Sequence, residues 1–89
     1  MEIDLHGFNH QQAVEETENF ILMEYKYADE VKIITGNSKK LQDKIIEMLD
    51  KHQLEIILIA ILGMKDKKRV PSNVAKYLIN KVYEMEVTK

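Results

Sequence analysis

The sequence has no cysteine and no tryptophan, and it has only 1 proline and 3 glycines among 89 residues. The absence of cysteine excludes a disulfide framework and a thiolate metal site. It fits a reducing compartment, so we expect a cytoplasmic protein. The longest apolar run, Ile56 to Leu62, has the length of a strand and is too short to span a bilayer, so we expect no membrane association.

Neither sign of charge is in large excess. The chain has 13 Lys and Arg residues and 15 Asp and Glu residues, which gives a net charge of −2. A molecule that is basic all over is therefore excluded, and nucleic-acid binding would need a local positive patch. With 45% hydrophobic and 31% charged residues, the composition is that of an ordinary soluble globular protein. The length suits one domain, which we expect to span residues 1–89.

Strand-like and helix-like segments alternate along the chain. We expect strands over Glu2–His6, Glu30–Gly36 and Leu54–Leu62. We expect helices from Asn9 to about Ala28, after Ser38 and after Ser72. This order predicts an α/β fold, a two-layer sandwich with a β-α-β-α-β core, a mostly parallel sheet and a C-terminal helix.

Polar residues mark the expected helix starts. Asn9 is typical of an N-cap, and Gln12 follows three residues later as its partner in a capping box. Ser38 and Ser72 take the same position before the second and third helices. The apolar residues of the third helix share a helical stripe, which comprises Val74, Leu78, Val82 and Met85.

In a parallel sheet the loops that follow the strands meet at one edge. These loops are His6–Phe8, Thr35–Ser38 and Met64–Val70. Open α/β sheets bind their ligands at the carboxyl ends of the strands. We therefore expect the functional site at this edge.

The second loop and the residues after it, with the sequence TGNSKK from Thr35, have the features of an anion site. Gly36 lets the backbone bend or approach a ligand closely. The free amides at the start of the next helix carry the positive end of the helix dipole, and Lys39 and Lys40 add charge. The alternative is a plain turn and helix cap with two solvated lysines.

The third loop is strongly basic. It contains four basic side chains and one acidic side chain, which are Lys65, Asp66, Lys67, Lys68 and Arg69. Such a charge run is usually solvated surface. Beside the second loop, however, it would form a positive patch that attracts phosphate.

Asp4 and His6 lie on the same face of the first expected strand, because side chains alternate along a strand. A histidine can act as a general base or acid, and a nearby carboxylate can orient it or stabilise its charge. The alternative is a structural role for the pair, such as a cap or a hydrogen bond at the strand end. His52, near the end of the second helix, suits the helix dipole and needs no chemistry.

Two stretches together resemble the Smr (small MutS-related) domain: IDLHG from Ile3 and VKIITGNS from Val31, each followed by a helix. That family pairs an Asp-Leu-His-Gly strand end with a His/Thr-Gly-x-Gly loop about thirty residues later. The likeness covers roughly residues 2–52. The two motifs at this spacing are far more specific than either one alone.

The resemblance implies a two-layer α/β domain that binds nucleic acid and, in several family members, cleaves it. It links the chain to DNA recombination and repair and to the cleavage of RNA on stalled ribosomes. Asp4 and His6 would be the catalytic pair, and Gly36 with its neighbours would cradle the phosphodiester. The expected partner is DNA or RNA, and Asp4 could hold a Mg²⁺ ion. The residues expected to bind phosphate are Gly7, Thr35, Gly36, Asn37, Ser38, Lys39, Lys40, Lys67, Lys68 and Arg69.

The chain departs from the family pattern in two places. Ser38 stands where the second glycine often lies, and the last third is expected to be a basic loop and a helix where the family has a further short strand. Three hypotheses follow: an Smr-like endonuclease, a non-catalytic module that recognises nucleic acid or branched junctions, and a protein-interaction adaptor. The small size and acidic net charge would suit the adaptor.

Overall fold

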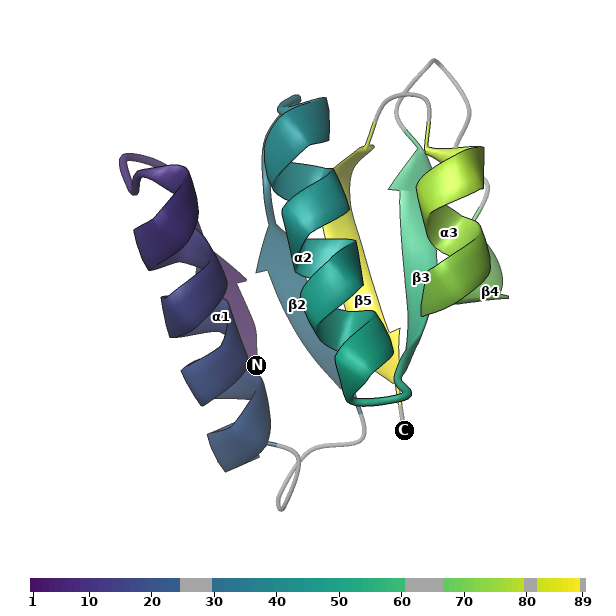
Figure 1. The fold of residues 1–89 in the computed structure, drawn as a ribbon, viewed down its shortest axis with the longest axis horizontal. Coiled ribbons are helices and arrows are strands. Elements are labelled where there is room, and N and C mark those ends of the chain that lie inside the picture. The colour runs from purple at the N-terminus through teal and green to yellow at the C-terminus, as the bar shows by residue number, and fades with distance from the viewer. Residues whose placement is uncertain (25–29, 61–66, 80–81, 89) are drawn as a thin grey trace.

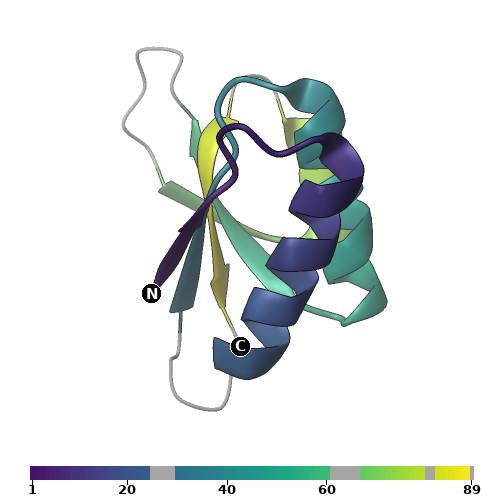
Figure 2. The same ribbon diagram turned by 90° about the vertical axis from the view of Figure 1, so that its left-hand side faces the viewer.

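The computed structural model describes residues 1–24, 30–60, 67–79 and 82–88. These residues form a mixed α/β fold in which the helices cover one face of a twisted sheet (Figures 1 and 2). In chain order the elements are β1 (Glu2–Asp4), α1 (His10–Glu24), β2 (Glu30–Ile34), α2 (Lys39–Lys51), β3 (Glu55–Ala60), β4 (Lys67–Pro71), α3 (Ser72–Leu78) and β5 (Val82–Thr88).

The sheet is mostly antiparallel, so the expectation of a mostly parallel sheet is wrong. The described strands form one five-stranded sheet in the order β1-β2-β5-β3-β4. Only β1 and β2 pair in parallel, while β5 is antiparallel to both of its neighbours and β4 is antiparallel to β3. Because β5 is reversed against both β2 and β3, the strands β1, β2 and β3 still run in one direction. Their carboxyl ends therefore lie at the same edge of the sheet, as the sequence predicts.

The C-terminal segment corrects the expected long helix. α3 ends at Leu78, and the stripe residues Val82 and Met85 lie on β5. β5 fills the place between β2 and β3, where its backbone is paired on both sides. Met85 and Val87 are fully buried, and Glu86 between them falls on the other face of the sheet, as in a strand. The pairing on both sides overrides the helical spacing, so this segment is a strand.

The expected basic loop is also partly a strand. Residues 67–71, with the sequence KKRVP, form β4 at the edge of the sheet, and residues 61–66, including Lys65 and Asp66, lie outside the described residues. Lysine and proline are common on edge strands, because one side of such a strand needs no backbone partner. A basic composition therefore does not exclude a strand at this position.

Helix boundaries follow the expected caps in two of three cases. The Asn9 side chain accepts a hydrogen bond from Gln12 N over 2.8 Å, and Gln12 Oε1 accepts one from Asn9 N over 3.4 Å, which confirms the capping box. Ser38 caps α2, with Leu41 N donating to its hydroxyl over 3.2 Å. Ser72 is not a cap; it begins α3 behind Pro71 and donates to Asp50 Oδ1 over 3.0 Å.

The core lies between the helices and the sheet. Its fully buried side chains include Ala13 and Ile21 of α1, Ile45, Ile46 and Leu49 of α2, and Ile33, Ile56 and Met85 of the strands. Ile56, Ile57 and Leu58 are all buried, as the continuous apolar run of this strand predicts. The expected α1 residues Tyr25 and Ala28 fall outside the described residues. Within the described ranges, no helix has both the length and the apolar character needed to cross a membrane.

Candidate functional site

The ends of β1 and β2 form an open pocket with a volume of about 220 Å³. The parallel register places Asp4 beside Ile34, so the residues that follow the two strands are also neighbours. The pocket is lined by Asp4, His6, Ile34, Thr35 and Gly36. The structure thus brings the two motifs of the sequence to one rim.

The turn after β1 is held by the carboxylate of Asp4. Asp4 Oδ1 accepts a hydrogen bond from the backbone N–H of His6 over 2.9 Å. Phe8 N donates to Leu5 O over 3.2 Å, and Gly7 has a φ of +87°, which favours glycine. Among the described residues, the structure places the carboxylate on the His6 backbone and not on its imidazole. β1 consequently ends at Asp4, two residues before the expected strand end, and the imidazole is exposed.

The buried side chain of Leu5 anchors this turn to the core. Leu5 is 3% exposed, and its N–H donates to Ile34 O over 3.0 Å. The backbone before His6 is therefore fixed to β2, the backbone after it is bonded back to Leu5, and His6 itself is exposed. This arrangement suits a side chain that meets an external ligand.

The turn after β2 uses its first two amides within the protein. Thr35 N and Gly36 N both donate to Tyr83 O, over 2.8 and 3.1 Å. Gly36 has a φ of +70°, and a Cβ at this position would meet no atom within 4 Å. The glycine is therefore required by the backbone conformation and not by a lack of space. The Gly36 amide is occupied, so it is not free to bind an anion as the sequence suggests.

The free amides of this loop begin one residue later. In the part of the chain that the structure describes, the amides of residues 37–40 have no acceptor. They precede and begin α2, where the positive end of the helix dipole lies. Lys39 and Lys40 are exposed beside them. This segment, residues 37–40, retains the anion-binding features that the sequence predicts for the loop.

The backbone of β4 lies away from the ends of β1 and β2. Lys67 starts β4 opposite Ile59, near the carboxyl end of β3, and Arg69 lies opposite Ile57 and is exposed. β4 is separated from β2 by two strands, or three strand spacings of about 4.8 Å each. Lys67 thus starts its strand at the expected edge of the sheet. Measured along that edge, its backbone lies roughly 14 Å from the strand that leads into the Gly36 turn.

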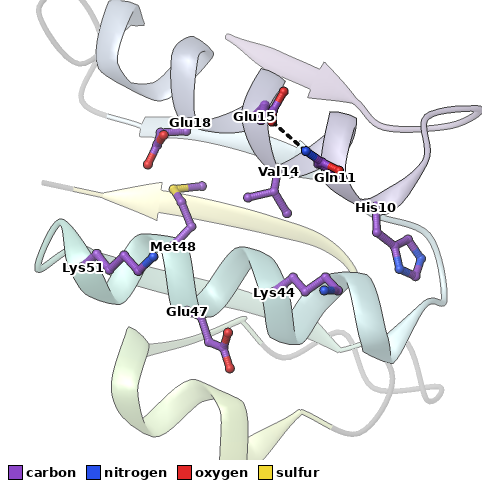
Figure 3. A pocket seen from close by; sticks show the side chains of 9 residues that line it. All are labelled: His10, Gln11, Val14, Glu15, Glu18, Lys44, Glu47, Met48 and Lys51. Atoms are coloured by element: carbon purple, nitrogen blue, oxygen red, sulfur yellow. Dashed lines mark hydrogen bonds between the residues drawn. The ribbon is translucent and has the colours of Figure 1, made fainter.

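A larger cavity, of about 480 Å³, lies between α1 and α2 (Figure 3). Val14 and Met48 lie between the helices, with Glu15 and Glu18 on α1 and Lys44 and Lys51 on α2. His10 lines this cavity and not the pocket of His6. At the C-cap of α2, His52 Nε2 lies 3.0 Å from Glu18 Oε2, so this histidine joins the two helices, and its place at the helix end is the expected one.

Sequence reasoning missed one part of the site's framework. Gln42 of α2 is 1% exposed, and its amide donates to Gly36 O over 2.9 Å. In the sequence, Gln42 is marked only by its place beside the apolar stripe of α2, seven residues after Thr35. Tyr83, whose carbonyl holds the Gly36 turn, lies in the segment that we expected to be helical.

The donor set for a metal is small. Within the described residues, no group of three or more His, Cys, Asp or Glu side chains could hold a metal ion. The pocket offers Asp4 and His6 only. Mg²⁺ commonly binds through one or two carboxylates, with waters and substrate phosphates as its other ligands. The exposed Asp4 carboxylate fits that mode of binding.

Comparison with known proteins identifies one family. The family model described as the Smr domain matches residues 3–78, which is nearly the whole chain. No curated protein and no solved structure matches the chain. The match includes both motifs that line the pocket and ends before β5.

Proposed function

Because the chain belongs to the Smr domain family, we propose that it binds nucleic acid and cleaves phosphodiester bonds in RNA or DNA. The family is associated with nucleic-acid binding and nuclease activity. The observation that carries the proposal is the shared pocket of Asp4, His6 and Gly36. We further propose that residues 1–89 form a single domain that works in the cytoplasm.

His6 is the proposed acid–base group. Its imidazole removes a proton from the attacking water or 2′-hydroxyl, or donates a proton to the leaving oxygen. Its exposed ring can reach a bound phosphodiester, while the Asp4 carboxylate holds the backbone of the same residue. Asp4 would therefore act on His6 through the turn.

Residues 37–40 are the proposed phosphate site. Their free amides, the helix dipole and the charges of Lys39 and Lys40 favour the negative charge that builds on the phosphate. Asp4 brings negative charge close to this site. A Mg²⁺ ion at the Asp4 carboxylate would neutralise that charge and polarise the phosphate when bound.

The direct test is a cleavage assay with His6→Ala and its matched control His10→Ala. Labelled single-stranded RNA, duplex DNA and a four-way junction are incubated with purified protein, with and without Mg²⁺. We expect His6→Ala to lose cleavage and to keep binding, and His10→Ala to keep both, because His10 faces the α1–α2 cavity. A substrate with one 2′-deoxy nucleotide at the cut separates attack by the 2′-hydroxyl from attack by water. Full cleavage by His6→Ala, from preparations free of contaminating nuclease, would disprove its role.

A non-catalytic nucleic-acid module is the second candidate. It is favoured by the Asp4 carboxylate, which bonds to the His6 backbone and leaves the ring without a carboxylate partner among the described residues. Binding without cleavage of any of the three substrates would select it.

An adaptor function is supported by exposed apolar side chains on α3, which are Val74, Tyr77 and Leu78. Protein partners that survive nuclease treatment would select the adaptor.

A further inference from the structure

Gln42 is a buried polar residue in an apolar environment. It lies on α2 with 1% of its surface exposed, beside Leu41, Ile45 and Ile46, which are also buried. A buried amide that lacks partners destabilises a protein, so its hydrogen bonds decide whether it is tolerated. The partners of Gln42 all belong to the Gly36 turn or to the start of β5.

The side-chain amide joins three segments. Gln42 Nε2 donates to Gly36 O over 2.9 Å and to Val82 O. It also lies 3.3 Å from Thr35 Oγ1. Since an amide nitrogen carries two hydrogens, the two carbonyl oxygens use both of them. One side chain of α2 thus links the carbonyl of the site glycine to the first residue of β5.

The Thr35 hydroxyl completes the network. It is 3.1 Å from Gly36 O and 3.3 Å from Tyr83 O, and it has one hydrogen to donate. The amides of Thr35 and Gly36 both donate to Tyr83 O. The turn is therefore held through its amides by β5, and through its carbonyl by Gln42.

We propose that Gln42 is a positioning residue, which fixes the Gly36 turn against β5 and so sets the direction of the free amides of residues 37–40. The inference rests on the proposed function for its catalytic consequence, but its geometric part stands without it. Val82 and Tyr83 lie beyond residues 3–78, so part of the framework of the site comes from outside the family match. A misplacement of about 1 Å in a catalytic constellation can lower a rate by about a hundredfold.

The first test needs no nucleic acid. In the unmodified protein, NMR should find the Gln42 side-chain protons in slow exchange and close to Gly36, whereas those of the exposed Gln53 exchange freely. In Gln42→Met, which keeps the length and helix propensity of the side chain, the Thr35 and Gly36 amides should exchange about tenfold faster or more. The Phe8 amide, in the other turn of the pocket, should not change.

A matched variant separates positioning from general loss of stability. Leu49→Ala removes a buried side chain of α2 at the end remote from the Gly36 turn. It should accelerate hydrogen exchange of all the core amides to a similar extent, with no larger effect on the amides of residues 35 and 36. Free exchange of the Gln42 side chain in the unmodified protein, or equal effects of both variants on the Gly36 amide, would overturn the proposal. Exchange of the Gln42 side-chain protons is measured in the unmodified protein, so it tests the proposal even if Gln42→Met does not fold.

The catalytic consequence is measured on the same proteins. Gln42→Met should lower the single-turnover cleavage rate about tenfold or more at saturating protein, while Leu49→Ala stays within about threefold of the unmodified protein below its unfolding temperature. If Gln42→Met releases the Gly36 turn and cleaves at the full rate, the positioning role is disproved. If the unmodified protein does not cleave, the proposed function fails, and the exchange experiment still decides whether Gln42 holds the turn.

Discussion

Asp4 Oδ1 lies 2.9 Å from the backbone nitrogen of His6, so a carboxylate at the end of β1 fixes the residue two positions further along the chain. The same two side chains line the pocket beside Gly36. This geometry separates two roles that the sequence leaves joined. Asp4 can hold the turn through one oxygen atom, or it can act through its negative charge.

Asp4→Asn and Asp4→Ala distinguish these roles. Asparagine keeps an oxygen that can accept the His6 N–H, whereas alanine removes the acceptor. If Asp4 works by holding the turn, Asp4→Asn should cleave within about threefold of the unmodified protein and Asp4→Ala should lose about tenfold or more. Single-turnover rates with the preferred substrate measure both. Equal loss in the two variants would show that the charge is essential, as it would be for a Mg²⁺ ligand.

Lys39 and Lys40 should contribute to nucleic-acid affinity through phosphate contacts. The double variant Lys39→Gln/Lys40→Gln should weaken binding and reduce the slope of log affinity against log salt by about 0.7 to 0.9 for each lost contact. The matched control is Lys44→Gln/Lys51→Gln, on the same helix but lining the α1–α2 cavity. A slope that is unchanged in the first variant, or reduced equally in both, would contradict a phosphate site at residues 37–40.

The β4 lysines provide a second comparison. Lys67 and Lys68 were expected in the same patch, but β4 lies three strand spacings from β2, roughly 14 Å. Neutralising them together with Lys39 and Lys40 should weaken binding further only if the nucleic acid extends along the edge of the sheet. We therefore expect Lys67→Gln/Lys68→Gln to affect long substrates more than a dinucleotide. Affinity measured against substrate length tests this directly, and an equal loss at every length would disprove it.

The position of the site could be predicted from the sequence because it depends on local order. The two motifs each follow a strand, and β1 and β2 form the one parallel pair of the described sheet, joined by α1. A parallel pair with a helical crossover brings both strand ends to one edge, whatever the rest of the sheet does. The prediction that Asp4, His6 and Gly36 are neighbours therefore does not depend on whether the rest of the sheet is parallel.

The error in the C-terminal segment comes from long-range pairing. β5 pairs with residues that lie 22 positions (Ala60 with Val82) to 58 positions (Glu30 with Thr88) earlier in the chain, and no local pattern specifies that insertion. Its stretch Met85 to Thr88 alternates in polarity, but a helical stripe through Val82 and Met85 fits the same residues. The hydrogen bonds of Gln42 could not be predicted either, because one of its carbonyl acceptors lies on β5.

Ser38 should stabilise the loop end of α2. Ser38→Ala removes the hydroxyl that accepts the Leu41 N–H over 3.2 Å, and we expect the free energy of unfolding to fall by about 1 kcal/mol. Urea denaturation followed by circular dichroism measures the change, with Lys44→Ala on the exposed surface of α2 as the control. Ser38→Gly should cost less, because glycine is tolerated at an N-cap. A larger loss for glycine than for alanine would show that the turn conformation, and not the cap, limits stability.

Met85 is a buried residue of the central strand β5, where the sequence predicts the apolar stripe of a helix. Met85 is 0% exposed on β5, whereas Met23 on α1 is 67% exposed. Met85→Ala should lower the free energy of unfolding by about 2 to 5 kcal/mol, because it leaves a cavity in the core between the helices and the sheet. Met23→Ala, the same chemical change on the surface, should stay within about 0.5 kcal/mol. Urea midpoints of the two variants give the comparison, and similar values for both would place Met85 outside the core. Since β5 also carries the carbonyl that holds the Gly36 turn, the Met85→Ala protein should lose cleavage as it unfolds, at the same urea concentration.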